Sequence, residues 1–205
     1  MNLVTILVTR SKSCHVKTLH SILRLNMRCL QKNCKNEIAY VDDDPYKKAE
    51  TIQRYMKSHD RIIFIDFGIG LDDDSLDQCF EPHETLGCLV FPGVTEGINW
   101  EMFKTKVQAG SEEPVSQMGL EFDTKVGKKI STDIYNVTFT NARAWMMNPK
   151  QVIKKAGTWK ISPKMFEKFN EQNVRVYAFT AAKLTLTYTH ECVSNILNAH
   201  GVKVN

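Results

Sequence analysis

The sequence predicts an α/β fold in which a central mixed, mostly parallel β-sheet is flanked by α-helices. Three short apolar runs rich in β-branched and aromatic residues alternate with two segments of helical periodicity before residue 70. This alternation is typical of right-handed crossovers in a parallel sheet. Because parallel sheets bind ligands beyond the carboxyl ends of their strands, the polar residues that follow each run are the first candidates for a functional site.

Composition narrows the class of protein. With 205 residues, 42% of them hydrophobic, the chain can bury the core of one domain. The net charge of +4 is spread along the sequence, so no nucleic acid is expected as a partner, and the weak basic bias suits a small anionic ligand. The six cysteines form no CxxC pair, and we find neither a signal peptide nor a stretch long enough to span a bilayer. These features predict reduced thiols and a cytoplasmic location.

The expected elements follow hydrophobic periodicity and turn residues. Apolar runs predict strands at 3–8, 37–41, 61–67, 86–91, 133–139, 142–147, 174–179 and 184–188. Helical spacing predicts helices after Ser13, Pro45, Ser75, Pro149, Pro163 and His190, and one more at 100–107. The first helix is expected to bury Leu19, Ile22, Leu23 and either Cys29 or Leu30, with Ser13 as its N-cap. Residues 109–131 have no sustained period, which indicates a long loop or lid.

The stretch 61–75 is the most informative part of the sequence. Its buried run ends on Asp66, just before a turn at Gly68. Burying an ionisable group at a strand end is costly, so a binding role is expected for this carboxylate, the alternative being that it only caps the turn. The acids at 72–74 are better explained as the start of a helix, where Asp is favoured. Asp44, directly before a proline, likewise predicts a helix cap.

Most known nucleotide-binding motifs are missing. There is no GxxxxGK[ST] phosphate loop and no GxGxxG after the first strand, which argues against P-loop enzymes and dinucleotide dehydrogenases. Asp66-Phe67-Gly68 spells the kinase metal motif, but the HRD and VAIK motifs that accompany it in kinases are absent. What remains is a parallel sheet that holds a diphosphate through a metal, with carboxylates as hard oxygen ligands.

The run from the first strand to Ser75 resembles the nucleotide-binding half of GT-A glycosyltransferases, in which a strand commonly ends in hydrophobics, Asp-x-Asp and a short turn. Asp66 matches the first Asp, and Gly68 stands where the second is expected. The segment 141–147 (NARAWMM) resembles the strand with a turn under the donor sugar, and 184–190 (LTLTYTH) resembles the loop from which some members supply a histidine to the metal. The whole chain is most similar to the small glycosyltransferase domain encoded by chlorella viruses.

The resemblance implies one glycosyltransferase domain over 1–205, with a Rossmann-like nucleotide-binding half at 1–95 and an acceptor and sugar-side half at 96–205. It implies hexosyl transfer from a UDP-sugar to a carbohydrate or glycoprotein acceptor, in the synthesis of viral capsid glycans in the host cytoplasm. Mn²⁺ or Mg²⁺ is expected on the diphosphate, held by Asp66 and His190, the alternative for His190 being a plain helix cap. Further domains of a longer polypeptide are compatible with this assignment.

The resemblance also implies which residues meet the substrates. Those expected to bind the nucleotide sugar are Thr9, Arg10, Ser11, Asp42, Asp43, Asp66, Phe67, Gly68 and Asn141. One of the acids at 42–44 is expected to accept the imide N–H of uracil. An inverting reaction needs a carboxylate that removes the proton of the acceptor hydroxyl. Asp123 and Glu121 are the first candidates for this base, beside Glu96 and Glu101.

Two other functions stay open. Glycine at position 68 is compatible with a nucleotide-sugar-binding module that has lost turnover. A nucleotidyltransferase shares this topology, but it is expected to carry a glycine- and lysine-rich loop after the first strand, and residues 9–13 contain no glycine. Release of UDP by slow donor hydrolysis separates an enzyme from a binding module, and release of pyrophosphate identifies a nucleotidyltransferase.

Overall fold

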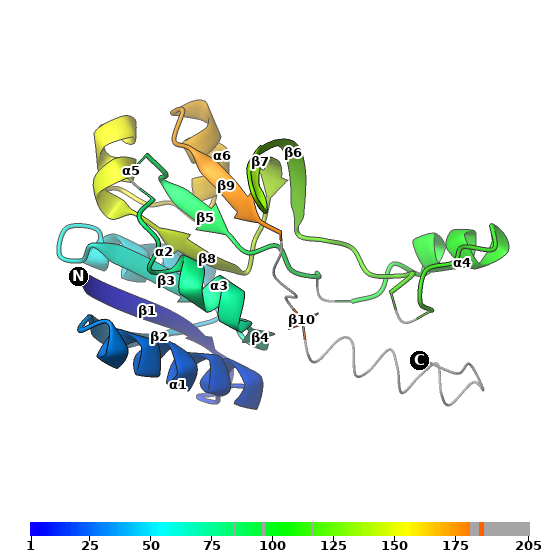
Figure 1. Cartoon of the computed structure of the whole chain (residues 1–205), viewed down its shortest axis with the longest axis horizontal. Helices are drawn as coiled ribbons and strands as arrows, with labels where there is room; N and C mark the ends of the chain where they lie inside the picture. The colour runs from blue at the N-terminus through cyan, green and yellow to red at the C-terminus, as the bar shows by residue number, and fades with distance from the viewer. Residues whose placement is uncertain (84, 96, 116, 181–184, 187–205) are drawn as a thin grey trace.

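The computed structural model describes residues 1–83, 85–95, 97–115, 117–180 and 185–186. Its centre is a mixed eight-stranded sheet with strand order β2-β1-β3-β8-β5-β9-β7-β6, which crosses the molecule in Figure 1. The strands are β1 (Asn2–Thr9), β2 (Lys35–Asp42), β3 (Arg61–Ile65), β5 (Cys88–Val90), β6 (Thr124–Ser131), β7 (Ile134–Thr140), β8 (Ala144–Met147) and β9 (Val176–Phe179). A separate pair joins β4 (Ile69–Gly70) to β10 (Thr185–Leu186). The predicted α/β class, a mixed sheet flanked by helices, is confirmed.

Three strands on one side of the sheet run parallel and end at one edge. β1 pairs with both β2 and β3, and the register places Thr9 opposite Asp42 and Leu7 opposite Ile65. Asp66, which follows β3, therefore lies at the edge where β1 and β2 also end. The sequence-based expectation that these strand ends share one edge is confirmed.

The fourth strand in spatial order, β8, runs antiparallel to β3 and lies between β3 and β5. Ala144 is opposite Ile65, so the residue before β8 reaches the edge at which β3 ends. The N–H of Asp66 donates to the carbonyl of Arg143 at 2.8 Å. Since β8 comes from beyond residue 95 and lies between strands that precede it, the two predicted halves of the chain interleave in one sheet.

Helices cover both faces of the sheet. They are α1 (Val16–Gln31), α2 (Pro45–Tyr55), α3 (Asp73–Gln78), α5 (Pro149–Ala156) and α6 (Met165–Glu171). A further helix, α4 (Trp100–Gln108), has no buried residue and does not pack on the sheet. Successive side chains of a strand point to opposite faces. Accordingly, Leu3 and Leu7 of β1 pack with α1 and α3 in one apolar cluster, whereas Val4 and Ile6 pack with α2, α5 and α6 in another. Burial of each such side chain contributes roughly 2 kcal/mol.

Most helix starts follow the predicted turn chemistry. Asp44 and Asp72 accept backbone N–H bonds at the starts of α2 and α3, and α5 begins after Asn148. The start of α1 differs from the prediction. His15, not Ser13, is its N-cap, and the His15 ring accepts a backbone N–H of the first turn.

The expected buried face of α1 is partly wrong. Ile22 and Cys29 are buried as expected, but Leu19 and Leu23 are exposed and Leu25 is buried in their place. Apolar residues extend around much of this helix. Periodicity alone therefore does not decide which stripe faces the core.

The segment between Val94 and Phe122, here called the arm, projects from the body. Figure 1 shows α4 at the right of the view, away from the sheet. This helix has no buried residue, and the side chain of Trp100 is 50% exposed. A backbone bridge between Val94 and Phe122 closes the base of the arm. Beyond it, β6 forms a hairpin with β7, so the prediction of a loop through residue 131 is wrong for its last part.

The described residues also bear on membrane spans and disulfides. Among these residues, no helix is both long enough and apolar enough to cross a bilayer. Among the described residues no disulfide is formed, and the cysteines there are Cys14, Cys29, Cys34, Cys79 and Cys88.

Candidate functional site

Asp66 is the central acid of the shared strand edge, and it is only 9% exposed. Its Oδ1 accepts the N–H of Phe67 at 2.8 Å and lies 3.5 Å from the Nζ of Lys48. Its Oδ2 accepts the Nε–H of Arg143 at 3.1 Å. Both carboxylate oxygens are therefore engaged with donors of the protein itself, two of which are cationic. Such pairing is what makes burial of a carboxylate tolerable.

Arg143 reaches Asp66 because β8 runs antiparallel to β3. Besides the bond to Asp66, one terminal nitrogen of its guanidinium donates to the carbonyl of Phe67 at 2.8 Å. Sequence reasoning placed the segment 141–147 in the site but did not single out this arginine. The sequence places this arginine at the start of an otherwise apolar run. Because a guanidinium in such a place requires an anionic or carbonyl partner, the pattern could have indicated that Arg143 pairs with an acid.

Asp43 extends the same set of contacts toward β1. Its Oδ1 lies 2.5 Å from the Nζ of Lys48, and its Oδ2 accepts the Nε–H of Arg10 at 2.7 Å. Burial would raise the pKa of Asp43, but Lys48 and Arg10 together lower it below its ordinary value. The guanidinium of Arg10 also lies over the ring of Phe67, 5.2 Å from its centroid.

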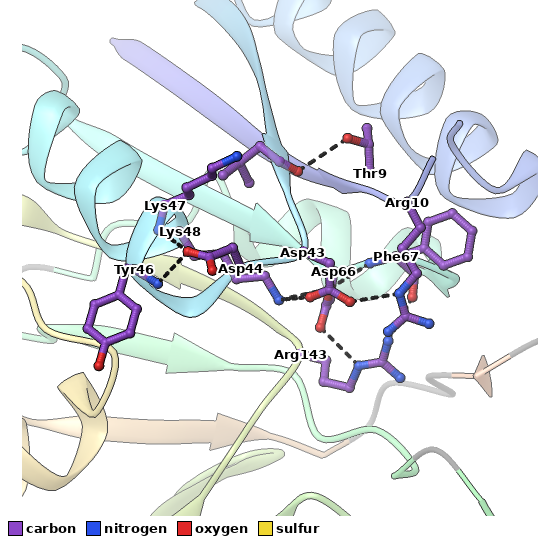
Figure 2. Close-up of polar contacts among 11 residues, drawn as sticks. Thr9, Arg10, Asp43, Asp44, Tyr46, Lys47, Lys48, Asp66, Phe67 and Arg143 are labelled. Atoms are coloured by element: carbon purple, nitrogen blue, oxygen red, sulfur yellow. Dashed lines mark hydrogen bonds and ion pairs between the residues drawn. The ribbon is translucent and has the colours of Figure 1, made fainter. Parts of the chain in front are cut away.

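These five side chains form one charged network at the strand edge. Figure 2 shows the five side chains converging: Arg10, Asp43 and Asp66 directly follow β1, β2 and β3, Lys48 belongs to α2, and Arg143 directly precedes β8. The signs of charge alternate along this order. The network contains more cations than carboxylates, so its formal charge is positive, which suits an anionic ligand.

A cavity of about 240 Å³ opens beside the network. Lys48, Asp66 and Arg143 contribute its charged lining, while Ile52 and Phe64 belong to its apolar lining. Phe64 stacks on a second lining residue, the buried Trp145, with ring centroids 4.9 Å apart. The cavity thus combines apolar walls with a few convergent polar groups, which is typical of small-molecule sites.

The hydroxyl of Ser162 is a further polar group of this cavity. Its Oγ is buried and has no hydrogen-bond partner in the described structure. A larger groove of about 800 Å³ adjoins the cavity and shares with it Asn141, Pro163, Met165 and Phe166. Asn141 was expected at the donor sugar, and it lies where the two spaces meet.

Asp123, one of the two expected bases, lies behind the segment that carries Arg143. It is 3% exposed, and its carboxylate accepts the N–H of Gly93 at 3.1 Å, the hydroxyl of Thr124 at 2.8 Å and the N–H of Arg143 at 3.4 Å. Burial raises the pKa of Asp123, although these donors and the charge of Arg143 oppose the rise. This carboxylate holds together the backbone of three segments.

Four other expected site residues lie outside the charged network. The hydroxyl of Thr9 donates to a carbonyl of β2 at 3.3 Å. Ser11 lies in an exposed turn with a left-handed φ of 50°, and Asp42 is exposed, with its Oδ2 2.6 Å from the Nζ of Lys47. Glu121 is exposed at the base of the arm, where it accepts an N–H of the Asn99 amide at 2.9 Å. Within the part of the chain that the structure describes, none of these four side chains pairs with the charged network.

A divalent metal does not fit the described residues around Asp66. Metal ligation needs carboxylate oxygens that point at the ion, but those of Asp66 are aimed at Lys48, Arg143 and a backbone N–H. Within the described ranges, no group of three or more His, Cys, Asp or Glu side chains could hold a metal ion. His190, the second expected ligand, lies outside the described residues.

Comparison with known proteins gives structural likeness only. No protein-family model matches the sequence, and a search of curated proteins finds no match. The fold is similar to a mutant of Drosophila β-1,4-galactosyltransferase 7 in complex with manganese, UDP-Gal and xylobiose, at 12% identity, with 92% of this chain and 69% of that chain covered and a TM-score of 0.46. It is also similar to the inositol-1-phosphate CTP transferase from T. maritima, at 9% identity, with 95% and 96% covered and a TM-score of 0.45.

A third similar structure is a glycosyltransferase involved in the glycosylation of the major capsid of PBCV-1. It is 6% identical, with 93% of this chain and 98% of that chain covered and a TM-score of 0.35. Glycosyltransferases are thus among the solved structures to which the chain is similar, as the sequence resemblance led us to expect.

Proposed function

We propose that this chain is a glycosyltransferase that takes a sugar from a nucleoside diphosphate sugar, with UDP as the nucleotide, and passes it to a hydroxyl of a carbohydrate or glycoprotein. The observation that carries the proposal is the positively charged network beside an apolar-walled cavity, at the edge where parallel strands end. A diphosphate requires cationic and N–H donors, and the base and sugar require a shaped, partly apolar space. A role in viral capsid glycans and a cytoplasmic location belong to the same proposal.

In this reaction the bond between the anomeric carbon and the diphosphate oxygen breaks, and its electron pair leaves with the diphosphate. A bond forms between the anomeric carbon and the acceptor oxygen, whose proton passes to a carboxylate of the protein. Cations fixed beside the leaving group stabilise the charge that develops on it. Lys48 and Arg143 are positioned for this role because both line the cavity.

We assign the base role to Glu121 and a positioning role to Asp123. The carboxylate of Glu121 is at an exposed position, whereas the oxygens of Asp123 hold backbone N–H groups in the interior. Glu121→Gln should lower sugar transfer by roughly 10²- to 10⁴-fold and leave the free energy of unfolding within about 0.5 kcal/mol of wild type. Transfer kinetics and urea unfolding measure the two effects. Unchanged transfer by this variant would move the base role elsewhere.

A nucleotide-sugar-binding module without turnover is the second candidate. It is favoured by Asp66, whose two oxygens are both bound within the protein. The experiment is to incubate the chain with UDP-, GDP- and CDP-sugars and to measure release of the nucleoside diphosphate, and in a second reaction to supply UTP and a sugar 1-phosphate and to measure release of pyrophosphate, each with and without Mn²⁺ or Mg²⁺. Release of UDP supports the transferase, and UDP-sugar binding without release supports the binding module. Pyrophosphate release from UTP and a sugar phosphate, or no binding of any nucleotide sugar, would contradict both.

A further inference from the structure

Lys48 occupies the point where two carboxylates of the site converge. Its Nζ lies 2.5 Å from the Oδ1 of Asp43 and 3.5 Å from the Oδ1 of Asp66. Two acids from different strand ends that face one another require a cation between them. In a metal site a divalent ion would have this place, but here the protein supplies an ammonium group from α2.

The cationic side chains around Lys48 oppose binding of a divalent ion between the two carboxylates. Asp43 is also bound by Arg10, and Asp66 is also bound by Arg143, so each carboxylate already has two cationic neighbours. An added ion would have to displace at least one of these cations or lie beside it. Like charges at such separations repel one another.

The same groups face a space that a phosphate can enter. Lys48 and Arg143 line the cavity, and their side chains are 20% and 13% exposed. The buried hydroxyl of Ser162, which has no hydrogen-bond partner in the described structure, lines this cavity as well. Ammonium, guanidinium and hydroxyl groups all donate to phosphate oxygens.

We propose that the chain binds the diphosphate of its donor without a divalent metal, with the ammonium of Lys48 in the role of the ion and with Arg143 and the Ser162 hydroxyl as further donors. Asp43 and Asp66 are positioning residues that hold the cations toward the cavity. This inference rests on the proposed function, because it concerns the diphosphate of the same donor. It replaces the Mn²⁺ or Mg²⁺ that the sequence resemblance implies.

The test is isothermal titration of the full chain with UDP, once in EDTA and once in Mn²⁺. Wild type should bind UDP in EDTA, with an affinity that Mn²⁺ changes less than threefold. Lys48→Gln should lose at least tenfold affinity in EDTA and should become dependent on Mn²⁺, because Asp43 and Asp66 then lack their shared cation. Lys47→Gln is the matched control: Lys47 is the preceding residue of α2, it pairs with the exposed Asp42, and its loss should leave UDP binding in EDTA unchanged.

Two more variants keep the test decisive if Lys48→Gln does not fold, which circular dichroism would reveal. Lys48→Arg keeps the charge and should retain binding in EDTA. Ser162→Ala removes only a hydroxyl and should weaken that binding three- to tenfold. UDP binding by wild type that disappears in EDTA overturns the inference but leaves the proposed function standing. Absence of UDP binding with and without Mn²⁺, together with no turnover of any UDP-sugar, overturns both.

Discussion

Asp66 and Asp123 are two buried carboxylates that hold the same residue in different ways. Asp66 binds the side chain of Arg143 and has Lys48 as a second cationic neighbour. Asp123 binds the backbone N–H of Arg143 and otherwise accepts from a hydroxyl and another backbone N–H. Burial alone therefore does not define a functional acid. The two acids differ in the charge of their partners, because Asp66 pairs with two cationic side chains whereas Asp123 accepts from a hydroxyl and backbone N–H groups.

Among the variants that distinguish Asp66 from Asp123, Arg143→Ala is expected to lower the free energy of unfolding most. The variant leaves the carboxylate of Asp66 buried with Lys48 as its one cationic neighbour among the described residues, and it also removes the donor to the carbonyl of Phe67. Breaking a buried ion pair from one side costs about 3 kcal/mol of the free energy of unfolding. Urea unfolding measures this cost. Arg143→Lys, which keeps the charge, should recover part of it, and a cost below about 1 kcal/mol would show that Asp66 does not depend on this partner.

Asp123→Asn is expected to cost about 2 kcal/mol, because the amide presents N–H donors to backbone N–H groups that now donate to a carboxylate. If the variant lost UDP affinity in proportion to its loss of stability, the assignment of Asp123 as a positioning residue behind Arg143 would be contradicted. We expect a loss of stability with only a small change in UDP affinity. Thermal unfolding and UDP titration of the same preparation compare the two effects.

The pH dependence of stability should separate Asp123 from Asp43. Burial raises the folded-state pKa of Asp123 above its ordinary value of 3.8, so the folded state holds this proton more tightly, and stability falls as pH rises from 3.8 through that pKa. The folded-state pKa of Asp43 is lowered by Lys48 and Arg10 in spite of burial, so its contribution is present above 3.8 and lost as pH falls through the lower pKa. Urea unfolding between about pH 3 and 7 should show opposite changes of slope for Asp123→Asn and Asp43→Asn. Slopes of the same sign would contradict the two environments.

Much of the parallel part of the fold could be predicted from sequence. The runs ending at Thr9, Asp42 and Asp66 are short and apolar, and in-register parallel pairing is enough to bring their ends together. The pairing of β3 with β8 could not be derived in this way, because it joins residues about 80 positions apart and no local pattern specifies an antiparallel neighbour. Arg143 was missed for this reason.

Local sequence patterns also could not predict which cation pairs with Asp43 and Asp66. Asp43 and Asp66 are separated by a whole helix in the sequence, and Lys48 lies in that helix as one of two adjacent lysines. Only the packing of α2 on the sheet shows that Lys48 meets both acids, whereas Lys47 meets the exposed Asp42. The carboxylate at the end of β3 could be singled out from sequence as a candidate, but its partners Lys48 and Arg143 depend on the three-dimensional packing.

The smallest expected effect concerns Gly68, the position at which the GT-A pattern has its second acid. Its φ of 80° is in the left-handed region, and a Cβ built there meets no atom within 4 Å. A substitution is therefore opposed by backbone strain and not by a clash, which predicts a loss of about 1 kcal/mol for Gly68→Ala. Gly68→Asn should cost less, because asparagine tolerates this region better than alanine. Urea unfolding of the two variants gives the comparison, and equal costs would mean that the turn selects glycine for a reason other than its φ angle. If the order holds, the left-handed φ of position 68 is what opposes substitution in the turn after Asp66.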